Sequence, residues 1–212
     1  MAPRVPNLEL NCRATLSALH NRIMDDVVTR ALAKWPHVPA CFGWLGLDAR
    51  GRWYLRDAAT QNRGNFEQAR GDWLRHPGLI DFIGRNYLSD AKGQWYFQNG
   101  PQRVYVELEA APWIWRVAPE GTMVSHTGQQ TQACQTFCDD EGRLYAASLL
   151  GLGLVHSLDV VVAADLIGHA AWPAPETVPA VDLQARFGYV RSPGNSARQL
   201  RPGGAASAIS RS

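Results

Sequence analysis

The sequence has no marked excess of charge of either sign and no long apolar run. Its 21 lysines and arginines face 19 acidic residues, which gives a formal net charge of +2. This near balance argues against nucleic acid or an anionic membrane surface as a partner. No stretch reaches the roughly eighteen consecutive apolar residues of a membrane-spanning helix. We therefore expect no nucleic-acid binding and no insertion into a membrane.

Cysteine is also scarce, with only four residues, Cys12, Cys41, Cys134 and Cys138. The N-terminus lacks an apolar signal segment, so we expect reduced thiols in a cytoplasmic protein rather than a disulfide framework. His126, Cys134 and Cys138 offer soft ligands, but a single Cys-x-x-x-Cys without a second pair falls short of a zinc site. No nucleophile elbow, phosphate-binding loop or complete dinucleotide fingerprint is present. The sequence thus predicts no metal and no cofactor.

Tryptophan, in contrast, is abundant, with eight residues in 212. Each indole buries a large apolar area and needs a partner for its N–H group. One interpretation is a core with its rim, and the other is an aromatic-lined pocket. The core is the favoured interpretation, because cores far outnumber pockets. A third interpretation is a homo-oligomer interface, where aromatic residues are enriched.

The densest structural signal lies between residues 76 and 117. A proline-initiated helix with apolar residues at spacings of four is predicted from Pro77 to about Tyr87. Asn99-Gly100 is the strongest hairpin signal in the chain. Beyond it, apolar and polar residues alternate, which indicates a half-buried strand. The apolar set is Val104, Val106 and Leu108, and the polar set is Arg103, Tyr105, Glu107 and Glu109.

Three heptapeptides share one pattern: Asp, any residue, a charged residue, Gly, Arg or Gln, Trp or Leu, and Tyr. They are Asp48–Tyr54, Asp90–Tyr96 and Asp139–Tyr145. Asp in the first position and Gly in the fourth suit a type I turn. We therefore predict three hairpins built alike, in one antiparallel sheet or in two packed sheets. True repetition and convergent turn chemistry both remain open.

The remaining segments complete an α+β prediction. An amphipathic helix is expected over residues 14–35, with its apolar stripe on Leu16, Leu19, Ile23, Val27, Ala31 and Trp35. A second helix is expected near 158–168, and a last strand at 186–191. The predicted fold is mainly antiparallel β hairpins, in a curved sheet or small sandwich, with two or three packed helices. Residues 14–192 form the single domain, between a frayed N-terminus at 1–13 and a disordered basic tail at 193–212.

The best candidate site is a polar patch on this central stretch. Arginine offers a planar fork to carboxylate or phosphate groups, so the patch would suit a small polar or anionic ligand. The alternative is a solvated hairpin tip beside a helix-capping arginine, because hairpin tips are polar anyway. The candidate ligand-binding residues are Arg85, Asn86, Tyr96, Gln98, Asn99, Arg103, Tyr105 and His126.

Three functions follow from these observations. The leading prediction is a non-enzymatic module that binds a small polar or anionic ligand, or a protein partner, through the region from Arg85 to Arg103. The second is a hydrolase-like enzyme that uses His126 with Cys134 or Asp139, because a nucleophile needs a base and an orienting group beside it. The third is a homo-oligomeric structural subunit joined through exposed tryptophans.

Several of these segments together resemble a known family. They are Trp35–Trp53, His76–Tyr87, Trp95–Val106 and Ala111–Trp113, and they are similar to an uncharacterised family of Gram-negative bacteria, a conserved domain of unknown function. The resemblance covers most of residues 33–168, with Phe187–Arg191 as a further piece. It implies one intracellular bacterial domain. The family supplies no activity and no site residues.

Overall fold

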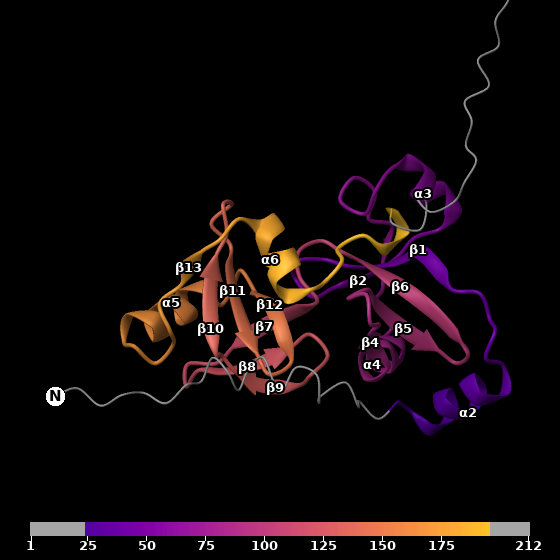
Figure 1. The fold of residues 1–212 in the computed structure, drawn as a ribbon, viewed down its shortest axis with the longest axis horizontal. Coiled ribbons are helices and arrows are strands. Elements are labelled where there is room, and N and C mark those ends of the chain that lie inside the picture. Colours follow the sequence, from indigo (N-terminus) through magenta and orange to yellow (C-terminus); the bar gives the residue numbers. More distant parts are fainter. Residues whose placement is uncertain (1–23, 196–212) are drawn as a thin grey trace, which may run out of the picture.

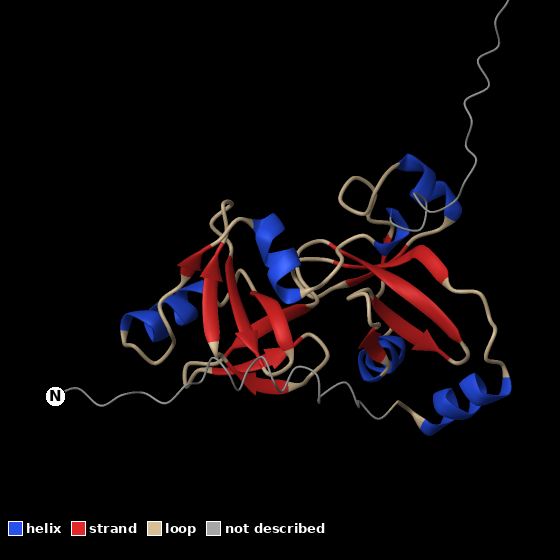
Figure 2. Cartoon of the chain, viewed as in Figure 1, coloured by secondary structure: helices blue, strands red, loops and turns tan. Residues whose placement is uncertain are grey.

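The computed structural model describes residues 24–195. Within this range the chain forms five helices and thirteen strands, arranged as two sheets (Figures 1 and 2). The predicted α+β class, with mostly antiparallel pairing, is confirmed. The predicted frayed segment at 1–13, residues 14–23 of the predicted first helix and the tail from residue 196 lie outside the described residues.

The first sheet has the strand order β3-β2-β1-β6-β5-β4. Its strands are β1 (Cys41–Leu47), β2 (Trp53–Leu55), β3 (Asp72–Trp73), β4 (Tyr87–Ser89), β5 (Trp95–Asn99) and β6 (Gln102–Leu108). Neighbours are antiparallel except β1 and β6, which pair in parallel. Three helices accompany this sheet, namely α2 (Asp26–Lys34), α3 (Ala58–Arg63) and α4 (Pro77–Arg85). The predicted hairpins and the proline-initiated helix are confirmed here.

The second sheet has the order β13-β10-β11-β12-β7-β8-β9. Its strands are β7 (Trp113–Val117), β8 (Thr122–Ser125), β9 (Gln130–Gln132), β10 (Gln135–Cys138), β11 (Leu144–Ser148), β12 (Gly151–Val155) and β13 (Glu176–Thr177). Helices α5 (Val160–Gly168) and α6 (Ala180–Phe187) lie beside this sheet in Figure 1. None of the helices between residues 24 and 195 has both the length and the apolar character that crossing a bilayer requires.

Five hairpins use the same turn. In each one, a glycine with positive φ occupies the fourth position and donates its N–H to the carbonyl of the first residue. These glycines are Gly51, Gly93, Gly121, Gly128 and Gly142. Such a loop is a type I turn closed by a glycine in the left-handed region. Two of the five hairpins lack the heptapeptide pattern and begin with Ala118 and Ser125, so the turn by itself accounts for the shared Gly but not for the shared Asp.

The first and third heptapeptides share more than the turn. Asp139 is 4% exposed, and its carboxylate accepts hydrogen bonds from Arg143 Nε at 2.7 Å and Tyr145 Oη at 3.0 Å. Asp48 is bonded in the same way by Arg52 and Tyr54. Burial alone would raise the pKa of Asp139, but the bonds from Arg143 and Tyr145 outweigh it and hold that pKa below its ordinary value. In both hairpins, the first residue of the turn is therefore a buried carboxylate paired with an arginine.

Two predicted elements are corrected. The stripe of the first helix placed Val27 and Trp35 inside, yet these side chains are 65% and 51% exposed, and Val28 is buried instead. Among the described residues, α2 is attached at its start, where the Asp25 N–H donates to Asn86, and Val28 is the residue of the helix that becomes buried. The predicted last strand at 186–191 is also wrong, because α6 occupies its start and only Val190 bridges to Gln94.

Aromatic rings join the two sheets. Trp53 and Tyr87 of the first sheet pack with ring centroids 5.3 Å apart, and Tyr87 in turn lies 5.6 Å from Trp113 of the second sheet. Trp115 lies 5.9 Å from Trp113, and its Nε1 donates to the Ala146 carbonyl at 2.9 Å. Buried apolar residues of both sheets form one continuous cluster. The core interpretation is confirmed for these tryptophans.

Replacing Trp115 with alanine should lower the free energy of unfolding by about 3–5 kcal/mol, the usual loss for a buried large aromatic side chain. The matched control is Trp44→Ala, because Trp44 is 47% exposed and its loss should matter by less than about 1 kcal/mol. Urea denaturation followed by circular dichroism measures both. Equal losses in the two variants would contradict the assignment of Trp115 to the shared core.

The pairing of Asp139 predicts a pH dependence. Its native pKa is lowered, so its stabilising effect is present above the unfolded pKa of about 4 and is lost as the pH falls through that value and the lower native one. Asp139→Asn should lower stability at pH 7 by about 1–3 kcal/mol and should flatten the dependence between about pH 5 and pH 3. Urea denaturation across this range tests the prediction, with Asp81→Asn on an exposed face of α4 as the control.

Candidate functional site

Part of the predicted patch is brought together by β5 and β6. Tyr96 pairs with Tyr105 and Gln98 with Arg103, so these four side chains share one face of the first sheet, as predicted for the two tyrosines. The Arg103 guanidinium lies 4.8 Å from the centre of the Tyr96 ring, and Tyr105 Oη donates to Asp90 at 3.0 Å. Asn99 lies exposed at the hairpin end. Within this row Arg103, Tyr96 and Tyr105 contact one another, whereas Gln98 donates to the Gly100 carbonyl.

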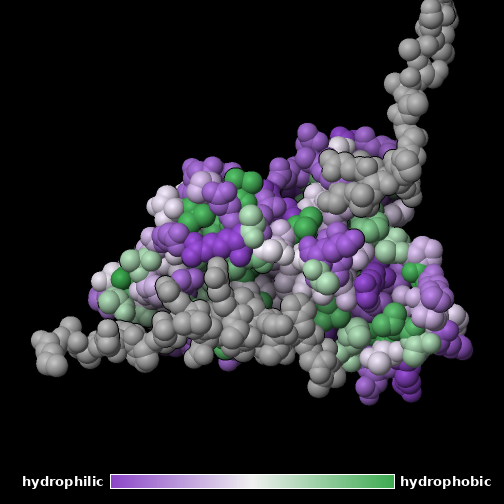
Figure 3. Space-filling view, in the orientation of Figure 1, coloured by the Kyte–Doolittle hydropathy of each residue, from purple (hydrophilic) through white to green (hydrophobic). Residues whose placement is uncertain are grey.

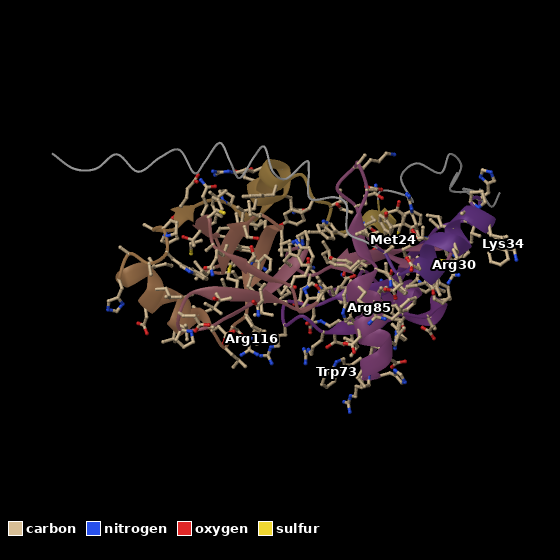
Figure 4. All side chains as sticks on the ribbon, turned by 90° about the horizontal axis from the view of Figure 1, so that it is seen from below. Met24, Arg30, Lys34, Trp73, Arg85 and Arg116 are labelled. Carbon is tan, nitrogen blue, oxygen red and sulfur yellow. The ribbon has the colours of Figure 1, made fainter. Side chains whose placement is uncertain are left out.

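Arg85 and Asn86 are not part of that row. Helix α4 covers the opposite face of the sheet, where Phe82 packs on Phe97 at 5.3 Å. Arg85 points toward α2 (Figure 4) and forms an ion pair with Asp25 at 3.3 Å. Asn86 is fully buried, and its side chain caps α4 through the Phe82 carbonyl at 3.0 Å. These two residues fasten α2 to α4.

His126 lies in the other sheet, at the turn between β8 and β9. Its ring is 5.4 to 5.8 Å from the rings of Trp53, Tyr87 and Trp113, and its Nδ1 accepts from a backbone N–H at 3.3 Å. Three strands separate β8 from β10, and Cys134 and Asp139 flank β10. Nowhere between residues 24 and 195 do three His, Cys, Asp or Glu side chains gather in a way that could hold a metal ion. In the order of the second sheet, His126 thus lies on a strand end that does not neighbour the strand flanked by Cys134 and Asp139.

A pair of adjoining cavities opens farther along the same face of β6. Their volumes are about 370 and 280 Å³. Both are lined by Asn65, Glu107, Ser192 and Asn195. The larger cavity also contacts Phe42, Gly43, Arg56, Gln61 and Gly64, and the smaller one Phe66, Glu67, Leu108, Gln184, Val190 and Arg191. Polar groups from three distant segments thus converge on one site.

Glu107 occupies the centre of this site. It faces Gly46 of β1 in the parallel pairing, and the absence of a side chain there lets the Phe66 ring settle on the strand, since a Cβ would lie 2.2 Å from it. Glu107 itself is only 4% exposed. Its two oxygens accept from Ser192 Oγ at 2.5 Å and from the Gly194 N–H at 3.0 Å. A buried acid therefore forms the wall common to both cavities.

Arg56 also lines the larger cavity and holds the segment 57–71, which the sequence indicates only as a long polar loop. Its guanidinium is buried and donates to the carbonyls of Ala69 at 2.8 Å, Gly64 at 2.7 Å and Gly43 at 3.3 Å. Asp57 begins α3 within this segment by accepting from the Thr60 N–H at 2.7 Å. A planar cation suits three converging carbonyls. The loop is thereby fixed as the rim of the larger cavity.

Residues 189–194, here named the closing segment, complete the site. The Val190 N–H donates to the Gly93 carbonyl at 2.9 Å, and the Arg191 carbonyl accepts from the Leu108 N–H at 2.8 Å. The sequence places Pro193 and Gly194 in the predicted tail, yet Pro193 is buried and Gly194 bonds Glu107. The chain thus returns from α6, beside the second sheet, to cover a face of the first.

The sequence pointed to the polar face of β6 but missed the residues that make the cavity. One signal was present, because Glu107 is an acid between the apolar residues Val106 and Leu108 of the predicted strand, and an acid that becomes buried there needs hydrogen-bond partners. Arg56, Asn65 and Ser192 carried no comparable signal. Each sits in an irregular segment, and nothing local reveals that these segments meet.

Fold and site together define an α+β protein of two sheets with a polar, ligand-sized cavity on one of them. The chain belongs to the family described as "Protein of unknown function (DUF2946)", whose profile matches residues 24–194. The predicted resemblance to a domain of unknown function is confirmed. No curated protein matches the chain.

The chain is also similar to two solved structures. One is a DUF1285 family protein from Silicibacter pomeroyi, with 14% sequence identity, 73% of this chain and 83% of that chain covered, and a TM-score of 0.43. The other is a DUF1285 family protein from Shewanella baltica, with 14% identity, 58% and 91% covered, and a TM-score of 0.40.

The role of Arg56 can be tested through the loop that it holds. Arg56→Lys cannot reproduce the planar fork, so we expect a loss of about 1–3 kcal/mol in stability from poorly satisfied carbonyls. Amide hydrogen exchange across residues 58–71 should become at least about tenfold faster. The control Arg103→Lys alters an exposed arginine that lies over a ring, and it should leave exchange in the loop unchanged. Slow exchange in Arg56→Lys would refute the role.

Proposed function

We propose that this protein is a non-enzymatic module that binds a small polar ligand in the two cavities beside Glu107. The observation that carries this proposal is a pair of adjoining cavities, of about 370 and 280 Å³, that share Asn65, Glu107, Ser192 and Asn195 as lining residues. Small-molecule sites typically measure about 300 to 1,000 Å³. A few convergent polar groups in such a site set the orientation of the ligand.

The polar character of the ligand is supported by what lines the site. Arg56 and Glu107 are each 4% exposed, and both border the larger cavity together with the amide side chains of Gln61, Asn65 and Asn195. Buried polar groups are costly unless they are hydrogen-bonded, so an apolar ligand would be disfavoured there. A ligand with several hydrogen-bonding groups fits this wall better.

Other predicted functions receive less support. An anionic ligand at the original patch would need free arginines, whereas Arg85 is paired with Asp25 and Arg103 lies over Tyr96. A homo-oligomer through exposed tryptophans stays a prediction. On the face shown in Figure 3, hydrophobic residues form small patches between hydrophilic ones. The cytoplasmic location stays a prediction as well.

A cavity-filling variant tests the proposal. Gln61→Trp places an indole in the larger cavity, because the Gln61 side chain already lies against Gly43. Thermal unfolding of the full chain is measured with a panel of amino acids, polyamines, sugars and nucleosides. A true ligand at a hundredfold excess over its Kd adds about 2.7 kcal/mol, or roughly 5–10 °C in Tm. The wild type should show such a shift and Gln61→Trp should lose it.

The matched control is Asn62→Trp, the same substitution one position along α3 at an exposed residue outside the cavity. It should keep the full thermal shift. A compound that stabilises the wild type and Gln61→Trp equally binds elsewhere, and that result would remove the cavity as the binding site.

A further inference from the structure

Within residues 24–195, Glu107 has no ion pair with a cationic side chain. Its hydrogen bonds come from two neutral donors, Ser192 Oγ at 2.5 Å and the Gly194 N–H at 3.0 Å. Buried carboxylates are otherwise paired with a cation or a metal ion, because burial strongly disfavours an isolated charge.

The arginines near the site are directed at other groups. Arg56 donates to three main-chain carbonyls, those of Ala69, Gly43 and Gly64. Arg191 donates to the Glu67 carboxylate and to the Glu109 carbonyl. Both side chains border the cavities, yet neither guanidinium is bonded to Glu107. The position beside the Glu107 carboxylate is therefore suited to a cation that arrives with the ligand.

We infer that the ligand is a small organic ammonium ion and that Glu107 is its anchor, an inference that rests on the binding function proposed above. Each oxygen of Glu107 accepts one hydrogen bond and has capacity for another, and an ammonium group carries three donors. The side chains of Asn65, Ser192 and Asn195 border both cavities and supply further acceptors. An anion at this position would instead be repelled by the carboxylate.

The test compares three probes of equal length that differ at one end. They are 4-aminobutan-1-ol, butane-1,4-diol and 4-hydroxybutanoate, which end in an ammonium, a hydroxyl and a carboxylate. Binding to the full chain is followed by amide chemical shifts in nitrogen-15 NMR titrations. The amino alcohol should bind at least tenfold more tightly than the diol, and 4-hydroxybutanoate should bind most weakly. The shifts should centre on residues 104–108 and 190–195.

Two variants isolate the charge. Glu107→Gln keeps the size and one acceptor oxygen for Ser192 or Gly194, and it should bring the affinities for the amino alcohol and the diol to within about twofold of each other. Glu109→Gln removes a carboxylate from the same face of the sheet, but that carboxylate is already paired with Arg70 at 2.6 Å and lines neither cavity. It should retain the full preference for the amino alcohol.

Different failures separate this inference from the proposed function. Equal binding of the diol and the amino alcohol by the wild type, or tighter binding of 4-hydroxybutanoate, would overturn the ammonium assignment while leaving the cavity as a site. If the ammonium preference is absent, loss of binding of all three probes in Gln61→Trp would still show that the probes bind in the cavity. A preference for the amino alcohol that survives in Glu107→Gln would remove Glu107 as the anchor. The comparison of probes on the wild type needs no variant to fold.

Discussion

The contact between aromatic rings of the two sheets is the constraint on which the rest of the structure depends. Trp113 of β7 packs on Tyr87 and Trp95 of the first sheet, and on Trp115 of its own strand. Gly153 leaves room for this packing, since a Cβ there would lie 2.3 Å from Trp115 Nε1. Because this packing fixes the two sheets relative to each other, it also fixes the position of the segment that links β6 to β7. Tyr87 and Tyr189 both donate to carbonyls of this link. Burial raises the pKa of Tyr189 to about 12, so its hydroxyl remains a donor near neutral pH.

Elements encoded by local chemistry could be predicted from the sequence. The turns at Asp48, Asp90 and Asp139 follow from an oxygen acceptor and a glycine three residues later, and α4 follows from His76-Pro77, where the histidine side chain caps the first turn. The parallel pairing of β1 with β6 could not be predicted. It joins segments about sixty residues apart in the chain, and the residue pattern of neither strand identifies the strand with which it pairs.

For the candidate site, the sequence allowed prediction only of the face of the sheet on which it lies. Alternation in β6 correctly assigned Tyr105 to a polar face shared with Tyr96, but grouping by closeness in sequence wrongly joined Arg85 and Asn86 to that face, because a helix and the strand that follows it can serve opposite sides of a sheet. Glu107 was placed on the right face without being recognised as its centre. The cavity requires Arg56, Glu107 and Ser192, whose convergence is a property of the completed fold.

The closing segment has a consequence for the order of events during synthesis. Ser192 follows Glu107 by 85 residues, and the whole second sheet lies between them in the chain. While the ribosome is still making β7 to β13, Glu107 lacks its two donors and the cavities lack a wall. A nascent chain could therefore not yet bind the ligand proposed above. Occupancy of this site would mark molecules whose translation has passed residue 194, and a ligand that stabilises them would favour finished chains over truncated ones.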